Sequence, residues 1–96
     1  MSNYISEVSY TDKNNKDYIS EVRVSGSLNS NSTEVWGRRK VVNSIEAGNI
    51  FYTKYKESNS WKQGSKVNII DVDGDKYLRT DSNKTKKDNL GKLPEF

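Results

Sequence analysis

Short stretches in which apolar and polar residues alternate run along most of this chain, as is typical of strands that bury one face. The first two such stretches, residues 4–8 and 18–22, both read YISEV. The segment between them is rich in turn-forming residues, so we expect a β-hairpin. A repeat architecture needs a longer period and at least three copies, so the echo indicates two strands that meet one core rather than a duplicated binding unit.

Charge predicts the register of this hairpin. A register with Glu7 opposite Glu21 would place like charges side by side. A shift by two residues keeps the same faces together and places Glu7 opposite Arg23 instead. We therefore expect the second register, in which residues 14–16 form a three-residue loop.

Helical spacing occurs at one place in the sequence. Val41, Val42 and Ile45 fall on one face of a helix of about three turns. Gly37 is expected at the N-cap, and Gly48 stands where a left-handed residue would end the helix. The pattern predicts a single short helix that covers one face of a sheet.

Three further segments have the composition of strands and are expected to follow the helix; they are residues 50–56, 66–72 and 76–80. Residues 57–65 are expected to form a loop, and the Asp73-Gly74 pair predicts a tight hairpin turn.

The expected order is therefore β-β-α-β-β-β, an α+β fold with an antiparallel sheet of about five strands. A chain of 96 residues has room for one modest core, so residues 1–96 are expected to form a single domain. Residues 82–96 show no clear period and are expected to pack on the sheet as an irregular tail.

Composition narrows the possible functions. The chain has neither cysteine nor histidine, which removes thiolate chemistry, the usual general base near neutral pH and the commonest metal ligand. We therefore expect a protein that is not an enzyme and needs no cofactor. No apolar run approaches the length of a membrane span, and the first residues do not resemble a signal peptide, so a cytoplasmic location is expected.

The C-terminal motifs resemble a known family. They are Tyr77-Leu78-Arg79-Thr80, Asp88-Asn89-Leu90 and Leu93-Pro94, which follow the ISEV strands and a helix ending in SIEAGN. In this respect the chain is similar to the small bacterial and phage domain called domain of unknown function 3892. The resemblance covers nearly the whole chain and implies the fold described above, but it implies no cofactor and no catalytic residue. Gly37 departs from the family pattern, which usually has Ser or Thr there.

Arg38, Arg39 and Lys40 stand at the start of the predicted helix, where cations are mildly unfavourable. One interpretation is an anion site, in which free N–H groups and the three cations hold a phosphate. The other is a solvated basic turn that is balanced by Glu34 and Glu46.

A second basic group surrounds Tyr77 near the C-terminus and includes Lys76, Arg79, Lys84, Lys86 and Lys87. Cations interleaved with an aromatic ring are typical of surfaces that bind single-stranded nucleic acid, but a solvated lysine tail also explains the pattern and is the preferred interpretation. Arg79 lies within a predicted strand, so we expect it to pair with Asp88 or with a carbonyl of the C-terminal segment and to anchor the tail.

Asp71, Asp73 and Asp75 alternate as the first ligands of a calcium loop do. The sixth position is Lys76 rather than Gly, and the twelfth is Ser82 rather than Glu, so a plain turn is the preferred interpretation.

The sequence thus favours a small non-catalytic binding module, and its expected partner is a protein. The alternative is nucleic-acid binding through the two basic groups, which the net charge of +3 supports only weakly. A monomer or a weak homodimer is expected.

Overall fold

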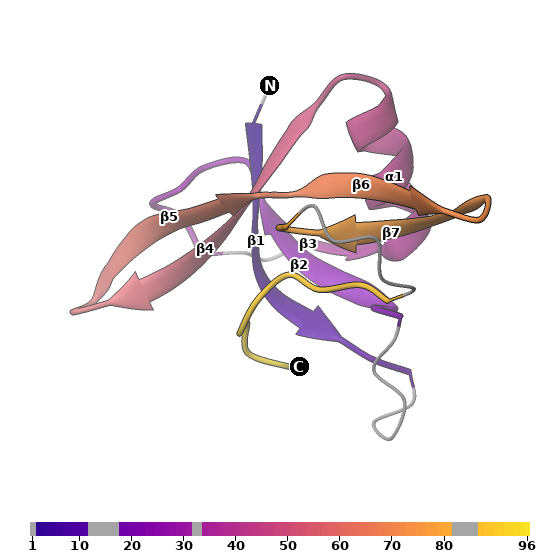
Figure 1. The fold of residues 1–96 in the computed structure, drawn as a ribbon. Coiled ribbons are helices and arrows are strands. Elements are labelled where there is room, and N and C mark those ends of the chain that lie inside the picture. Colours follow the sequence, from indigo (N-terminus) through magenta and orange to yellow (C-terminus); the bar gives the residue numbers. More distant parts are fainter. Residues whose placement is uncertain (1, 12–17, 32–33, 82–86) are drawn as a thin grey trace.

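The computed structural model describes residues 2–11, 18–31, 34–81 and 87–96, and the fold is shown in Figure 1. In these ranges the elements in chain order are β1 (Ser2–Ser9), β2 (Glu21–Ser25), β3 (Glu34–Gly37), α1 (Arg38–Glu46), β4 (Ile50–Glu57), β5 (Ser60–Lys66), β6 (Asn68–Val72) and β7 (Asp75–Arg79). The predicted fold class, α+β with one helix after the first strands, is confirmed.

Among the described residues the main sheet has five strands in the order β3-β2-β1-β4-β5, and β6 and β7 form a separate two-stranded sheet. Every strand of the main sheet pairs antiparallel with at least one neighbour, but β1 and β4 pair with each other in parallel. The expected all-antiparallel sheet is therefore corrected to a mixed one. The cause is the connection through α1, because a helical crossover returns the chain to the sheet in the same direction.

The register of the first hairpin is the predicted one. Glu7 lies opposite Arg23 and Val8 opposite Val22. The Glu7 carboxylate lies 3.6 Å from the Arg23 guanidinium, so the opposite charges pair as predicted. A bulge at Ser6 shifts the register by one residue, as a result of which both Ile5 and Val8 are buried. The predicted loop at residues 14–16 lies outside the described residues.

Two strands were not predicted. β3 runs directly into the helix, and β5 occupies most of the expected loop at residues 57–65. β5 has exposed residues on both faces, so its sequence carries no alternation of apolar and polar positions. Its backbone pairing with β4 defines it as a strand instead.

The helix begins at Arg38, with Gly37 at the N-cap, and Gly48 follows its end with a φ of +103°. Both glycines therefore have the predicted positions, and Gly48 adopts the left-handed conformation that favours glycine. Val41 and Val42 are buried against the sheet.

The β6–β7 turn is also as predicted. Asp73 and Gly74 have φ values of +53° and +87°, which is the pair of positive angles that a two-residue hairpin turn requires.

One core joins the sheet, the helix and the C-terminal segment. Its buried side chains come from β1, β2, α1, β4 and β7, and Leu90 of the segment after β7 lies among them. The chain end also pairs with β1, because the amide of Val8 donates to the Pro94 carbonyl over 2.9 Å. The tail thus packs back on the sheet in the residues that the structure describes there. No helix among the described residues is both long enough and apolar enough to span a membrane.

Candidate functional site

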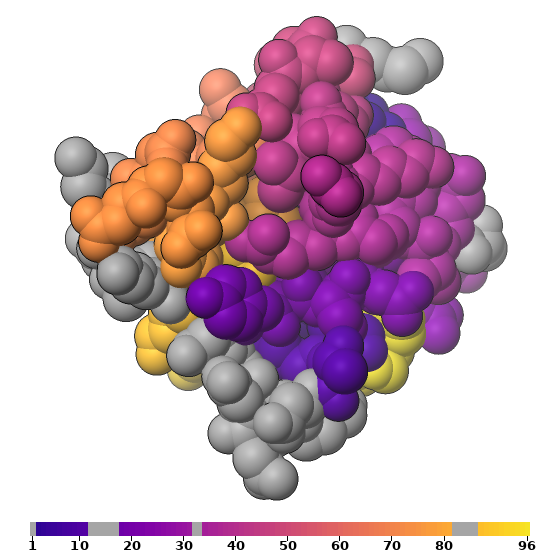
Figure 2. Space-filling model, turned by 90° about the vertical axis from the view of Figure 1, so that its right-hand side faces the viewer, coloured from indigo at the N-terminus to yellow at the C-terminus, as the bar shows by residue number. Residues whose placement is uncertain are grey.

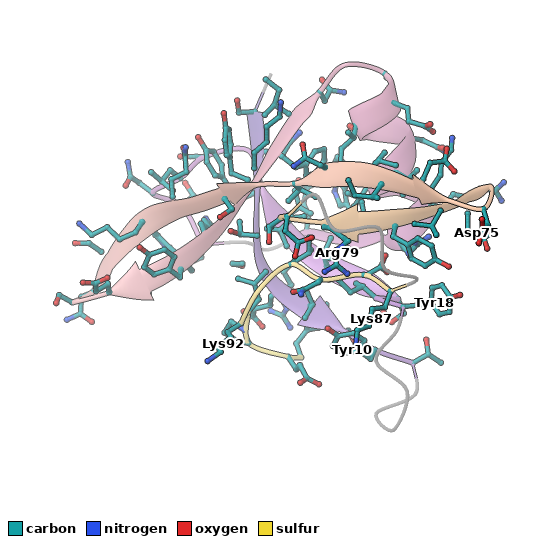
Figure 3. All side chains as sticks on the ribbon, in the orientation of Figure 1. Tyr10, Tyr18, Asp75, Arg79, Lys87 and Lys92 are labelled. Atoms are coloured by element: carbon teal, nitrogen blue, oxygen red, sulfur yellow. The ribbon has the colours of Figure 1, made fainter. Side chains whose placement is uncertain are left out.

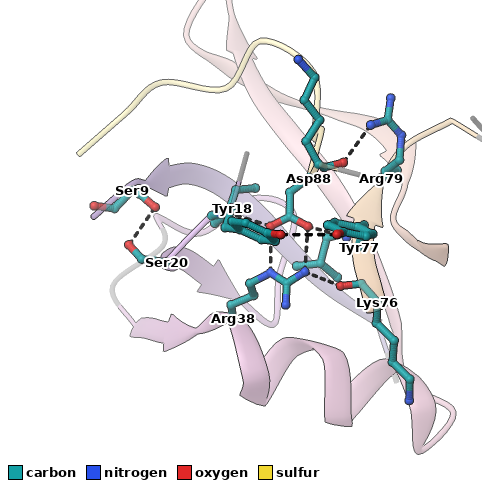
Figure 4. Close-up of polar contacts among 11 residues, drawn as sticks. Ser9, Tyr18, Ser20, Arg38, Lys76, Tyr77, Arg79 and Asp88 are labelled. Atoms are coloured by element: carbon teal, nitrogen blue, oxygen red, sulfur yellow. Dashed lines mark hydrogen bonds and ion pairs between the residues drawn. The ribbon is translucent and has the colours of Figure 1, made fainter. Parts of the chain in front are cut away.

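The buried Asp88 carboxylate accepts hydrogen bonds from several segments of the chain (Figure 4). The amides of Ile19 and Leu78 donate to it, each over 2.8 Å. It also accepts from the Arg38 guanidinium, over 2.8 Å from Nε and 2.9 Å from Nη2. Four donors therefore converge on one carboxylate. These hydrogen bonds connect four segments, which are the residues just before β2, the start of α1, the strand β7 and the C-terminal segment.

This cluster, here called the Asp88 clasp, consists of Asp88, Ile19, Arg38 and Leu78. The Asp88 side chain is fully buried, whereas the Arg38 side chain is 25% exposed. A buried carboxylate is tolerated only when its charge and its lone pairs are satisfied, and here two amides and a two-pronged guanidinium satisfy them. The hydrogen bonds to Asp88 raise the pKa of Arg38.

Two tyrosines lie against the clasp. The rings of Tyr18 and Tyr77 are stacked with their centroids 5.8 Å apart, and their hydroxyls lie 3.4 Å from each other. The Arg38 guanidinium lies 5.8 Å from the centre of the Tyr18 ring and 6.0 Å from that of Tyr77. Tyr77 is buried, but Tyr18 is 52% exposed. The hydrogen bond with Tyr18, followed by burial, raises the pKa of Tyr77 to about 12.

Tyr18 and Arg38 border an open pocket of about 460 Å³ between the helix and the β6–β7 turn. The residues around it are Tyr18, Arg38, Arg39, Val42, Asn43, Glu46, Gly74, Asp75 and Lys76. In Figure 2 the orange β6–β7 hairpin, the magenta helix and the purple segment that begins at residue 18 meet on this face. Lys76 forms an ion pair with Glu46 at the pocket wall, which raises the pKa of Lys76. The pocket therefore presents both signs of charge.

The three cations at the start of the helix do not converge. Arg38 is paired with Asp88, and it also donates to the Lys76 carbonyl. Arg39 is exposed and borders the pocket, while the Lys40 ammonium lies 4.1 Å from the centre of the Trp36 ring. Each cation thus has a different neighbour, and the anion site stays a prediction that concerns Arg39 most directly.

The residues of the second basic group also have different neighbours. Tyr77 is buried in the stack, and the guanidinium of Arg79 donates to the Asp81 carboxylate over 2.6 Å and to the Lys87 carbonyl over 2.8 Å. The Asp81 hydrogen bond raises the pKa of Arg79. The prediction that Arg79 anchors the tail through a carbonyl is confirmed, whereas Asp88 pairs with Arg38 instead.

The predicted lysines of this group have separate outcomes. Lys84 and Lys86 lie outside the described residues, and Lys87 is exposed. Figure 3 shows Lys87 and Lys92 well apart along the described tail.

The three aspartates that resemble the start of a calcium loop do not surround a common point at which an ion could bind. Asp71 lies opposite Lys76 in the β6–β7 ladder, Asp73 belongs to the turn, and Asp75 borders the pocket. Within the described ranges, no three potential ligands are grouped so that they could hold a metal ion.

Sequence reasoning missed the roles of Tyr18 and Asp88. The alternating pattern places Tyr18 in the second predicted strand, and the sequence marks Asp88 only within the motif Asp88-Asn89-Leu90 and as an expected partner of Arg79. The available signal was weak: Asp88 is an acidic residue in a basic segment, two positions before the apolar Leu90.

Searches among curated proteins and among solved structures found no significant match. A family model described as "Protein of unknown function (DUF3892)" matches residues 4–94, which include every element from β2 to β7 and all four members of the Asp88 clasp. The chain therefore belongs to the DUF3892 family.

Proposed function

We propose that this protein is a non-catalytic binding module that recognises a protein partner through the pocket beside the Asp88 clasp. The observation that carries the proposal is Tyr18, whose ring is half exposed and yet held in place by Tyr77 and Arg38. An exposed aromatic ring without such support would move among several conformers, and a partner would have to arrest it.

A ring that is already ordered before binding favours a higher affinity. Tyrosine and arginine are enriched among the residues that contribute most to protein interfaces, and here Tyr18 lies beside Arg38 and Arg39 at one pocket. Because the stack already orders Tyr18, little side-chain entropy is lost when a partner contacts it. The rigid ring therefore favours specific recognition at this position.

The charges around the pocket favour a protein over a polyanion. Asp75 and Glu46 stand on the same walls as Arg39 and Lys76. A phosphate backbone would meet these carboxylates as well as the cations, whereas a folded partner or a peptide can present side chains of both signs. We therefore expect a partner that offers an acidic group to Arg39 and a donor or cation to Asp75.

The test uses the immobilised full chain and a nuclease-treated lysate of the organism that encodes it. We expect the wild type to retain a defined protein partner. Tyr18→Ala should weaken the binding of the purified partner about 30-fold, the effect of a residue that contributes about 2 kcal/mol. Arg39→Ala should weaken it by a smaller factor. Binding of the partner is measured by calorimetry.

Tyr55→Ala is the matched control, because Tyr55 is also an exposed tyrosine, at 46%, but lies on β4 away from the pocket. It should bind the partner as the wild type does. If Tyr18→Ala and Arg39→Ala retain the same proteins with the same affinities as the wild type, the pocket is not the binding site.

A further inference from the structure

The β4–β5 hairpin reaches away from the rest of the fold, as Figure 1 shows on the side opposite the β6–β7 turn. Residues opposite each other in a ladder share a face, so Lys56 shares one with Trp61, and Tyr52 shares one with Lys66. Tyr52 and Lys56 are four residues apart on one strand and therefore point the same way. We call Tyr52, Lys56, Trp61 and Lys66, together with Tyr4 beside Tyr52, the hairpin face.

Positive charge is concentrated on this hairpin. Residues 50–66 contain four lysines and one glutamate, a local net charge of +3. Lys56, Lys62 and Lys66 are exposed, and no carboxylate of the described residues forms an ion pair with them. Two of the cations at the pocket differ in this respect, because Arg38 and Lys76 each have a carboxylate partner.

Aromatic rings accompany these lysines. The Tyr4 and Tyr52 rings are stacked with centroids 6.0 Å apart and planes inclined by 25°. The Trp61 ring has the Lys54 ammonium 4.3 Å and the Lys56 ammonium 5.3 Å from its centre. All three rings are partly exposed. Cations and flat rings thus alternate along one surface.

Lys54 explains how Trp61 is held. Lys54 is buried, and its ammonium donates to the carbonyls of Ser27 and Leu28 as well as to that of Ser30. Burial lowers the pKa of Lys54. Lys54 therefore belongs to the structure and positions the ring. Lys56, in contrast, is exposed and can leave the ring to pair with an anion.

We propose that the hairpin face binds single-stranded nucleic acid, with Tyr52 and Trp61 as stacking platforms and Lys56 and Lys66 as phosphate contacts. Interleaved rings and cations are the combination that such ligands require, since every base has a stacking face and every phosphate a charge. Along β4 the two platforms are about 13 Å apart at about 3.3 Å per residue, a span of several nucleotides. The inference is independent of the pocket proposed above, and either can fail alone.

Unpaired bases are the ligand because the faces of paired bases are hidden in a duplex. A pure charge effect would not distinguish a single strand from a duplex or from polyphosphate. Because the rings stack on unpaired bases, we expect the hairpin face to bind a single strand more tightly than a duplex or polyphosphate.

The test is fluorescence anisotropy of labelled oligothymidylate and oligouridylate across a salt series, with unlabelled duplex and polyphosphate as competitors. We expect the protein to bind at least one of these two oligonucleotides at low salt. Trp61→Ala should weaken this binding by a factor between about 5 and about 150, the range for one stacked base. Lys56→Ala and Lys66→Ala should each reduce the slope of log K against log salt by about 0.7. These two lysines are exposed, so their replacement leaves the fold intact.

Lys62→Ala and Tyr55→Ala are the matched controls. Both residues belong to the same hairpin and are opposite each other on its other face. They should change the salt slope and the affinity far less than the replacements on the hairpin face do. Absence of binding at low salt, equal competition by duplex or polyphosphate, or equal effects of Lys56→Ala and Lys62→Ala would each overturn the proposal.

Discussion

The surroundings of Tyr77 change the pKa of its hydroxyl group. Tyr77 is buried, it hydrogen-bonds with Tyr18, and the two effects together raise its pKa from 10.0 to about 12. The folded protein therefore holds this proton more tightly than the unfolded chain does. The corresponding contribution to stability is fully present below pH 10 and is lost as the pH rises towards 12.

A titration of tyrosinate absorbance tests this difference. We expect a transition near pH 12, and we expect it to disappear in Tyr77→Phe. Tyr55→Phe is the control, because Tyr55 lies on β4 and is not part of the Tyr18–Tyr77 stack, and it should leave the transition near pH 12 in place. Ionisation of all tyrosines of the folded wild type together near pH 10 would contradict the raised pKa of Tyr77.

At the scale of elements, β5 depends on a glycine. A Cβ on Gly64 would lie 2.3 Å from the Thr53 Oγ1 and 3.2 Å from the Thr53 carbonyl oxygen. The same hydroxyl accepts a hydrogen bond from the amide of Ser65 over 3.0 Å, at the irregularity in the β4–β5 ladder. Glycine thus lets the two strands approach at their bulge.

Gly64→Ala should therefore destabilise the fold, by about 1–3 kcal/mol as overpacking typically does. The measurement is the midpoint of urea denaturation. Gly26→Ala is the matched control, because a Cβ at Gly26 meets nothing within 4 Å, and it should leave the midpoint nearly unchanged. Equal midpoints for the two variants would show that the approach at Gly64 is not restrictive.

The elements that the sequence predicted are those with a local signal. The first hairpin had opposed charges, the helix had Val41 and Val42 on one face, and the Asp73-Gly74 turn had its characteristic pair. The strand β5 had none, because an exposed edge strand is defined by its partner's backbone rather than by its own apolar pattern. The parallel pairing of β1 and β4 is set by the path of the whole chain, which no local pattern contains.

The candidate site was predicted less well than the fold. The sequence marked Arg38 and Arg39, and both border the pocket. It did not reveal that Asp88, fifty residues away from Arg38, is the partner of that arginine. Long-range pairing between single charged residues leaves no periodic trace in one sequence, so only the structure brings the two together.

At the scale of the whole molecule, the account depends on the Asp88 clasp. It ties four segments together, and through Arg38 it supports the stack that orders Tyr18 at the pocket. Asp88→Asn should reduce the free energy of unfolding by about 3 kcal/mol, the low end for breaking a buried pair, since Arg38 keeps some solvent contact. Asp75→Asn, at an exposed site, should change it by less than about 0.5 kcal/mol.

Hydrogen exchange at the amides of Ile19 and Leu78 tests the clasp most directly, because both amides donate to Asp88 rather than to a backbone carbonyl. In the wild type we predict that both exchange as slowly as the core amides of β1 and β2, and that Asp88→Asn accelerates these two before the rest of the sheet. If both amides of the wild type exchanged as rapidly as those of exposed loops, the clasp would not hold the molecule together in solution.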